Sequence, residues 1–256
     1  MIIDRIFYTL ARRWLLFLNL LVAVYVGLPI LAPGLMHAGL TGPANLIYRA
    51  YSPMCHQLAS RSFFLFGEQP AYPRAIVGSS LTPIEAYMPS IPEFAAASPD
   101  PEQWSTFLLP ARIFRGNEQM GYKMALCQRD ISIYLSILIG GLIYAVVRRR
   151  GPVRPMPFWL FVIVGLGPIA LDGFSQLFSQ MFVGLGIESL VQIVPLRESS
   201  PLLRSLTGMI MGLSIVWLLY PRLDDQFTMT ANDIGRRLAA REAADNEALS
   251  TDQAAR

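Results

Sequence analysis

Residues 131–147 read ISIYLSILIGGLIYAVV, a run without a single charged side chain. A helix that crosses the hydrocarbon core of a bilayer needs about 17 to 25 predominantly apolar residues. A segment inside lipid must also satisfy its backbone hydrogen bonds internally, which favours a helix over other conformations. This stretch therefore predicts a transmembrane helix.

The composition of the whole chain points to the same class of protein. Of the 256 residues 53% are hydrophobic and 15% are charged, and the mean hydropathy is +0.41, which is unusual for a soluble domain. Further apolar stretches lie on both sides of the first one. The predicted spans are residues 14–31, 131–147, 158–176 and 204–220. We therefore expect an all-α integral membrane protein, a bundle of about four transmembrane helices within residues 1–222.

The first span has a possible alternative role as a secretory signal, because Arg12 and Arg13 precede it. Its apolar run is longer than the usual signal core of about 7 to 15 residues, and no clean cleavage site follows. We expect a retained anchor.

The arginines predict how the bundle is oriented. The net charge of +3 rests on arginine, since Lys123 is the single lysine. Arginines concentrate before span one, between spans two and three, and after span four, at positions 5, 12, 13, 148–150, 154, 222, 236, 237 and 241. Under the positive-inside rule these clusters share one side if the chain crosses four times. We expect a multi-pass protein of the cell membrane with both termini cytoplasmic, and this placement gives no indication of nucleic-acid binding.

Three segments outside the spans have distinct characters. Residues 66–120 form an insert in the first outer loop, rich in Pro, Ser and Ala, and its scattered aromatic side chains suggest that it folds over the outer end of the bundle or meets a partner. Residues 181–196 are interrupted by Glu188 and Gln192, which favours an interfacial or re-entrant helix over a fifth span. Residues 223–256 mix charges with alanine and predict a polar cytoplasmic tail, partly disordered.

Polar side chains recur where the spans meet the outer side. In LDGFSQLFSQ, residues 171–180, Asp172, Gln176 and Ser179 fall on one helical face. An Asp at this depth is costly unless it is paired or solvated, so Asp172 is a candidate functional residue. The start of span four reads RESSPLLRSLTG, in which Ser200 predicts an N-cap and Pro201 the first helical position. Gly208 and Gly212 then predict close packing within the bundle rather than a dimer interface.

Four motifs in this order resemble a known family. CHQLASRSF, CQRDISIY, LDGFSQ and RESSPLLRSLTG, among four apolar spans, are similar to the predicted membrane proteins grouped as domain of unknown function 2085, from about Cys55 to Gly212. The resemblance implies a membrane protein and no assigned activity. The chain departs from the family pattern where Asp130 replaces a further cysteine of many members, and where about 70 residues separate Cys55 from Cys127.

The two cysteines leave three interpretations open. A disulfide between Cys55 and Cys127 is favoured if both face an oxidising compartment. A metal site is the second, with Cys55, His56, Cys127 and Asp130 as available ligands. The third is a pair of packed thiols, or a thiol nucleophile assisted by His56.

The arginines at the outer ends of the spans have two interpretations as well. They could bind a phosphate or carboxylate, such as a lipid headgroup, or be solvated and structurally paired, with Arg204 bonded to Asp172. The candidate ligand-binding residues are Gln57, Arg61, Arg129, Gln176, Arg197, Glu198 and Arg204.

Two functions follow, and the sequence does not name a cofactor for either. The preferred one is a non-enzymatic membrane component that binds a lipid or partner subunit through the outer polar cluster. The alternative is a membrane-embedded enzyme acting on an anionic substrate, with Asp172 or His56 as acid or base. Nucleotide-binding, HExxH, CxxC and GxSxG motifs are all lacking in the sequence.

Overall fold

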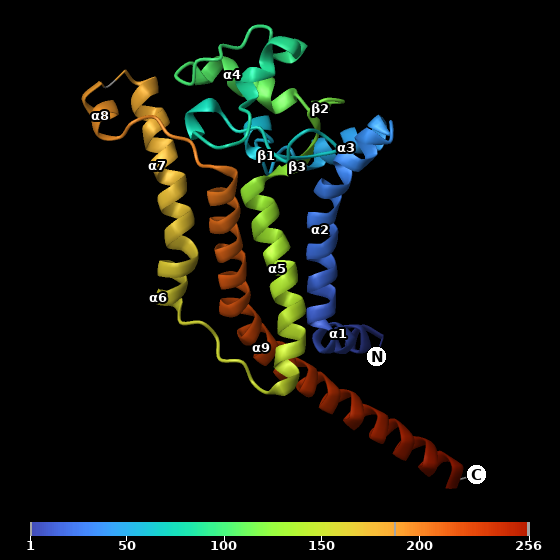
Figure 1. Ribbon diagram of the computed structural model, residues 1–256. Helices are drawn as coiled ribbons and strands as arrows, with labels where there is room; N and C mark the ends of the chain where they lie inside the picture. The colour runs from blue at the N-terminus through green and yellow to red at the C-terminus, as the bar shows by residue number, and fades with distance from the viewer. Residues whose placement is uncertain (1, 187, 255–256) are drawn as a thin grey trace.

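A computed structural model describes residues 2–186 and 188–254, and four long apolar helices dominate it (Figure 1). The helices that are long and apolar enough to cross a membrane are Trp14–His37, Gln128–Arg150, Phe158–Gly184 and Pro201–Ala244. The predicted helical membrane protein with four spans is confirmed. Many apolar side chains on these helices are exposed, including Leu16, Leu20 and Val24 on the first, as expected for surfaces that contact lipid.

Helix α2 (Trp14–His37) and helix α5 (Gln128–Val147) are the first two spans, and α5 ends in a short 3-10 turn, η6 (Arg148–Arg150). The third span joins α6 (Phe158–Leu160), a π-helical segment η7 (Phe161–Leu166) and α7 (Gly167–Gly184). Pro168 lies just beyond this segment and has no N–H to donate to the preceding turn. A widened helical turn there is the expected accommodation.

Helix α9 (Pro201–Ala254) contains the fourth span and continues past it. The backbone N–H of Leu203 donates to Ser200 Oγ at 3.1 Å, so the predicted N-cap is confirmed. Pro221 has no N–H for the carbonyl of Trp217, and the N–H of Met156 donates to that oxygen instead at 3.1 Å. The link between α5 and α6 is thereby fixed to α9 at the point where the helix leaves the bundle (Figure 1).

Close packing of α5 on α9 depends on glycine. A Cβ added at Gly208 would lie 2.6 Å from the carbonyl oxygen of Arg129, and one at Gly212 would meet the carbonyl of Ile133 and the hydroxyl of Ser136. These glycines therefore pack within the chain, as the sequence predicts.

One end of the bundle is covered by residues 41–127, which we call the cap. It contains α3 (Thr41–Tyr51), α4 (Trp104–Ile113) and a three-stranded antiparallel sheet of order β1-β3-β2, formed by Ser62–Leu65, Gly121–Cys127 and Gly116–Asn117. Ser62 lies opposite Cys127 and Phe64 opposite Lys123. The strands were not predicted from the sequence. Gly121 adopts a φ of +73°, and a Cβ there would collide with the backbone of Leu65, so the approach of β1 to β3 requires glycine.

The insert of residues 66–120 folds around apolar side chains of its own. Its 3-10 turns η2 (Ala75–Val77), η3 (Ile84–Ala86), η4 (Met88–Ser90) and η5 (Pro92–Phe94) lie between β1 and α4, and η1 (Ala59–Arg61) precedes β1. Tyr72, Ile84 and Phe107 are fully buried in one cluster. The buried guanidinium of Arg74 pairs with Glu85 and lies 4.0 Å from the ring centre of Phe107. The insert covers the end of the bundle, one of the two roles expected for it.

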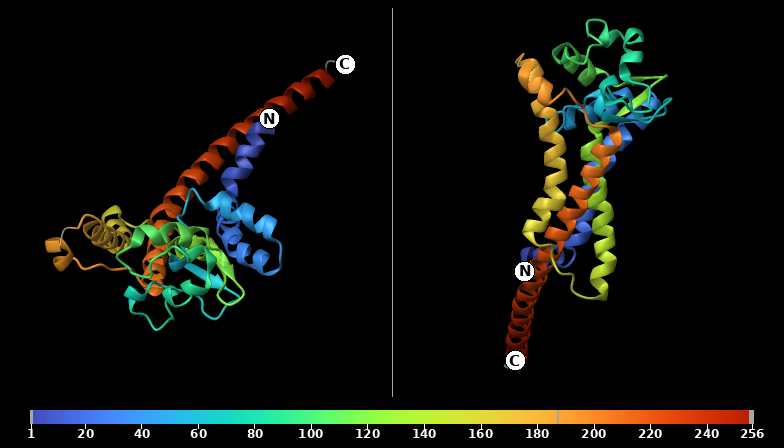
Figure 2. Two further views of the ribbon diagram at one scale, coloured as in Figure 1. Left: turned by 90° about the horizontal axis from the view of Figure 1, so that it is seen from above. Right: turned by 60° about the vertical axis from the view of Figure 1, so that its left-hand side comes forward.

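Two short helices flank the spans. Helix α1 (Ile2–Arg12) exposes Ile2, Ile6 and Phe7 and lies beside the extension of α9 (Figure 2). This amphipathic helix was not predicted. Helix α8 (Glu188–Ile193) lies at the capped end next to α7 (Figure 1). The predicted interfacial segment, residues 181–196, is therefore divided: its first residues, up to Gly184, belong to α7, and α8 lies in its second part.

Replacing Gly212 tests the packing of α5 on α9. Gly212→Ala places a Cβ under 3.0 Å from α5, and overpacking of this kind costs about 1–3 kcal/mol. We expect unfolding at lower dodecyl sulfate concentration in mixed micelles, followed by tryptophan fluorescence. Gly27→Ala on α2 is the matched control, because nothing lies within 4 Å of the added carbon. Equal stability of the two variants would contradict the packing described.

Candidate functional site

The candidate site gathers around the first turn of α5, where that helix leaves the sheet. Cys127 ends β3, and Gln128 begins α5 with its buried amide donating to the Ser62 carbonyl at 3.0 Å. Successive helical residues diverge by about 100°. Asp130 accordingly lines a cavity together with Tyr25 of α2, whereas Arg129 pairs with Asp172 of α7. Two polar clusters result, one on each side of the same helical turn.

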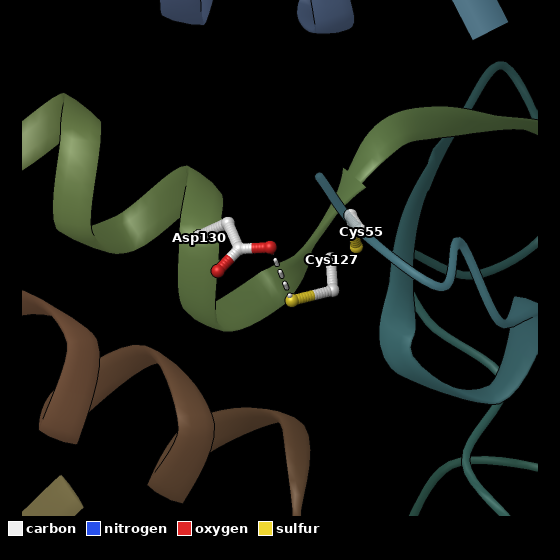
Figure 3. Close-up of side chains that lie close together, drawn as sticks. All are labelled: Cys55, Cys127 and Asp130. Carbon is white, nitrogen blue, oxygen red and sulfur yellow. Dashed lines mark hydrogen bonds between the residues drawn. The ribbon is translucent and has the colours of Figure 1, made fainter. Parts of the chain in front are cut away.

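The first cluster consists of Cys55, Cys127 and Asp130, and we call it the thiol cluster (Figure 3). One ligand atom from each residue, a sulfur or a carboxylate oxygen, lies within 4.8 Å of the other two. The Cys127 thiol donates to Asp130 Oδ2 at 3.1 Å. Both cysteines are free thiols, and the predicted disulfide between them stays a prediction.

The two thiols differ in acidity. The interaction with the neighbouring Cys127 side chain lowers the pKa of the Cys55 thiol, against the opposing effect of burial. The same interaction, together with burial, raises the pKa of Cys127.

The backbone around Cys55 is held by buried polar contacts. Gln57 adopts a φ of +52°, and its N–H donates to Cys55 Sγ at 3.4 Å. Its side-chain amide donates at 2.9 Å to each of two carbonyls, those of Tyr48 and Ala125. The ammonium of Lys123 is fully buried and donates to the carbonyls of Gln57 at 2.5 Å and Arg112 at 2.8 Å. Burial lowers the pKa of Lys123 to about 7.

Two candidate residues from the sequence do not point into the clusters, and their ligand-binding roles stay predictions. Gln57 is a candidate ligand-binding residue, and in the structure its amide N–H groups donate to backbone carbonyls and hold the loop. His56 is a candidate metal ligand and a candidate acid or base, and in the structure it is exposed and lies outside the thiol cluster. Adjacent side chains in this irregular segment point to different sides, and Cys55 is the one that is buried.

The second cluster connects α5, α7, α9 and the cap, and we call it the arginine network. Its members are Arg61, Arg129, Asp172, Gln176, Arg197, Glu198, Ser199 and Arg204. Asp172 is 5% exposed and receives hydrogen bonds from Arg129 and Ser199, and from Arg197 at 3.0 Å. A buried carboxylate is costly unless it is paired, and Asp172 is paired with two arginines.

Glu198 is the second carboxylate of the network. It accepts from Arg61 Nε at 3.0 Å and from Arg204 Nη2 at 3.1 Å. Arg204 also donates to Gln176 Oε1 at 2.8 Å. The predicted pairing of Arg204 with Asp172 is therefore wrong, because this guanidinium pairs with Glu198, while Gln176 bonds to both Arg204 and Asp172.

The polar stripe on α7 is buried as one face. Asp172, Gln176 and Ser179 are all buried, whereas the neighbouring Leu171 and Phe174 are exposed. This result favours a packed polar face over the alternative in which the third span ends at Leu171 and the stripe is solvated.

Several contributors were not singled out from the sequence. Ser199 bonds both Asp172 and Gln176. The ring of Trp104, from the insert, lies 5.0 Å from the Arg61 guanidinium. Both contacts are long-range, so no local pattern indicates them. Only the polar character of RESS, residues 197–200, offered a signal for Ser199.

Comparison with known proteins agrees with this picture of a membrane protein. A family described as "Predicted membrane protein (DUF2085)" matches residues 114–218, a range that includes Cys127 and Asp130 and also most of the arginine network. The chain is 25% identical over 175 residues to the uncharacterized protein MJ1492 of Methanocaldococcus jannaschii, covering 68% of this chain and 67% of that protein. No solved structure matches. The resemblance found in the sequence is confirmed, and it carries no assigned activity.

Neutralising Asp172 tests whether it holds the network together. Asp172→Asn leaves Arg129 and Arg197 without their anion, and losing one partner of a buried ion pair costs about 3–5 kcal/mol. We expect early unfolding in dodecyl sulfate and faster amide hydrogen exchange in α7. The control is Glu242→Gln, which breaks an exposed pair with Arg5 and is expected to change stability by less than about 1 kcal/mol. An Asp172→Asn protein as stable as the control would contradict the structural role.

Proposed function

We propose that this membrane protein binds an anionic lipid headgroup through the arginine network. The observation that carries the proposal is a charge imbalance: four guanidiniums surround two carboxylates, Asp172 and Glu198. Each arginine contacts one of these carboxylates, but the network as a whole keeps a net charge of +2. Uncompensated charge is costly at a membrane boundary, and a phosphate would supply the missing negative charge.

The donors of the network also support an anionic ligand. Arg61 Nη2 and Arg129 Nε are buried and have no hydrogen-bond partner. A buried donor of this kind usually has one. Guanidinium groups match phosphate oxygens in geometry, often through two parallel hydrogen bonds. Arg197 is the most exposed member, with 36% of its side chain accessible, and offers the approach for a headgroup.

An apolar groove begins beside Arg197. It runs along α7, has a volume of about 520 Å³, and is lined by Leu171, Phe174, Phe178 and Phe182 among others. Ser175 also lines this groove and accepts a hydrogen bond from Arg197. A polar end that carries positive charge, continued by an apolar groove, fits a lipid whose headgroup contacts Arg197 and whose chain lies along α7.

Binding is better supported than catalysis. The crevice at Arg197, Glu198 and Trp104 has a volume of only about 10 Å³, about the space for one water molecule, so a substrate has no room inside the network and an anion would contact Arg197 at its exposed edge. Asp172 already accepts hydrogen bonds from arginine and serine side chains. These contacts favour a carboxylate that stays charged over an acid or base that exchanges a proton. No described feature specifically favours the enzyme alternative.

The positive-inside rule supports an orientation in which the cap is extracytoplasmic. The loop with Arg148–Arg150 and the N-terminus lie at the uncapped end, and the extension of α9 leaves from that end (Figure 1). With this end cytoplasmic in a cell membrane, the arginine network meets the outer leaflet.

Fusions test the orientation. Alkaline phosphatase fused after the C-terminus is expected to be inactive in a bacterial host and a green fluorescent protein fusion to be fluorescent, since both termini are cytoplasmic. An active phosphatase and a dark fluorescent protein would reverse the orientation.

Lipid retention tests the ligand. Native mass spectrometry of the protein from mixed phosphatidylglycerol and phosphatidylcholine micelles is expected to show selective retention of phosphatidylglycerol. Arg197→Gln should weaken that retention about tenfold, which corresponds to about 1.4 kcal/mol, and Arg197→Lys should weaken it less because the charge remains.

The control for this experiment is Arg241→Gln, an exposed arginine at the other end of the molecule that pairs with Asp4. Its retention should match that of the wild type. Equal retention by Arg197→Gln, or a co-purifying protein subunit on the network in place of lipid, would contradict the proposal.

A further inference from the structure

The thiol cluster brings together side chains from three different segments of the chain. Cys55 follows α3, Cys127 ends β3, and Asp130 lies in the first turn of α5 (Figure 3). Their nearest ligand atoms are mutually within 4.8 Å, and the two sulfurs are not bonded to each other. Two soft sulfur atoms and one carboxylate oxygen therefore converge on one point.

We propose that Cys55, Cys127 and Asp130 bind a divalent transition-metal ion of the zinc type. Zinc accepts thiolate sulfur at about 2.3 Å and carboxylate oxygen at about 2.0–2.2 Å. Two thiolates on one tetrahedral zinc are then about 3.8 Å apart. The cluster, whose ligand atoms are at most 4.8 Å apart, reaches this geometry with side-chain adjustments of about 1 Å. Calcium and magnesium are not suited, since they prefer oxygen ligands.

Backbone contacts hold the two cysteines in place. Ser62 pairs with Cys127 across the sheet, and the N–H of Gln57 donates to Cys55 Sγ. Contacts that orient ligands in this way are typical of metal sites. The positive end of the α5 helix dipole also faces the cluster, because Cys127 directly precedes the helix. Two thiolates and a carboxylate around a divalent cation leave one net negative charge, which this helix end offsets.

The fourth coordination position of the ion is expected to face a cavity that Asp130 lines. A cavity of about 490 Å³ is lined by Tyr25, Met54, Leu126, Asp130 and Tyr134 among others. Three protein ligands with the fourth position open to a cavity are typical of zinc sites that bind water or an exchangeable ligand, whereas structural zinc sites are closed by four protein ligands. The ion would thus be accessible from the space between α2 and α5.

Asp130 distinguishes a metal site from a redox pair. A disulfide between Cys55 and Cys127 needs no carboxylate, whereas a three-ligand site requires the carboxylate that Cys127 contacts at 3.1 Å. Substitutions at Asp130 therefore separate the two interpretations without removing either sulfur.

The experiment uses the full chain in mild detergent, reduced and then freed of reductant, and titrated with Zn²⁺ or Cd²⁺. Inductively coupled plasma mass spectrometry is expected to find one ion per chain, and Cd²⁺ should produce the ultraviolet absorption of cadmium–thiolate bonds. Cys55→Ser and Cys127→Ser should lose the ion, and Asp130→Asn should bind it at least tenfold more weakly. His56→Ala, adjacent to Cys55 but outside the cluster, is the matched control and should bind as the wild type does.

Asp130→Cys shows whether the loss of metal in the other variants is due to misfolding. It supplies a third thiolate in place of the carboxylate, so it should retain Cd²⁺ and increase the cadmium–thiolate absorption by about half, since three thiolates replace two. Gel filtration confirms that each variant is folded. The proposal is overturned if the reduced wild type binds no more metal than the serine variants, if Asp130→Asn binds as tightly as the wild type, or if His56→Ala loses the ion.

Discussion

The arrangement of this protein depends on two buried carboxylates, Asp172 and Glu198, each held by two arginines. The third span needs this connection most, because only 11% of its apolar window is buried inside the protein, against 39% for the fourth span. Apolar packing therefore contributes little to holding α7 in the bundle. Asp172 attaches it to Arg129 of α5 and to Arg197 on the segment before α9, so the same ion pairs that bring the arginines together also position the helix.

Adjacent residues at the start of α5 serve two different clusters. Arg129 points toward α7 and Asp130 toward the cavity between α2 and α5, a consequence of helical geometry. The cap supplies partners to each cluster, Arg61 to the arginine network and both cysteines to the thiol cluster. Folding of the cap onto the bundle is thus what completes both sites, which explains why polar side chains from distant motifs meet there.

The sequence predicts what is local and fails where pairing is long-range. Four spans, the Ser200 N-cap and the buried face of Asp172, Gln176 and Ser179 follow from hydropathy and helical periodicity, and all are found. The strands are short, and β1 pairs with β3 across about 60 residues, so no local pattern indicates them. For the same reason Glu198 could not be identified as the partner of Arg204, nor Gln57 as a support of the Cys55 loop.

Imaging the protein in its lipid environment tests the central claim, that the carboxylates assemble an anion site at the edge of the bundle. The measurement is a cryo-electron microscopy structure in nanodiscs that contain phosphatidylglycerol. The account predicts phosphate density in hydrogen-bond contact with Arg197, continued by an acyl chain along Phe174 and Phe178. Well-resolved lipid elsewhere on the bundle, with the arginine network closed and no anion beside Arg197, would contradict it.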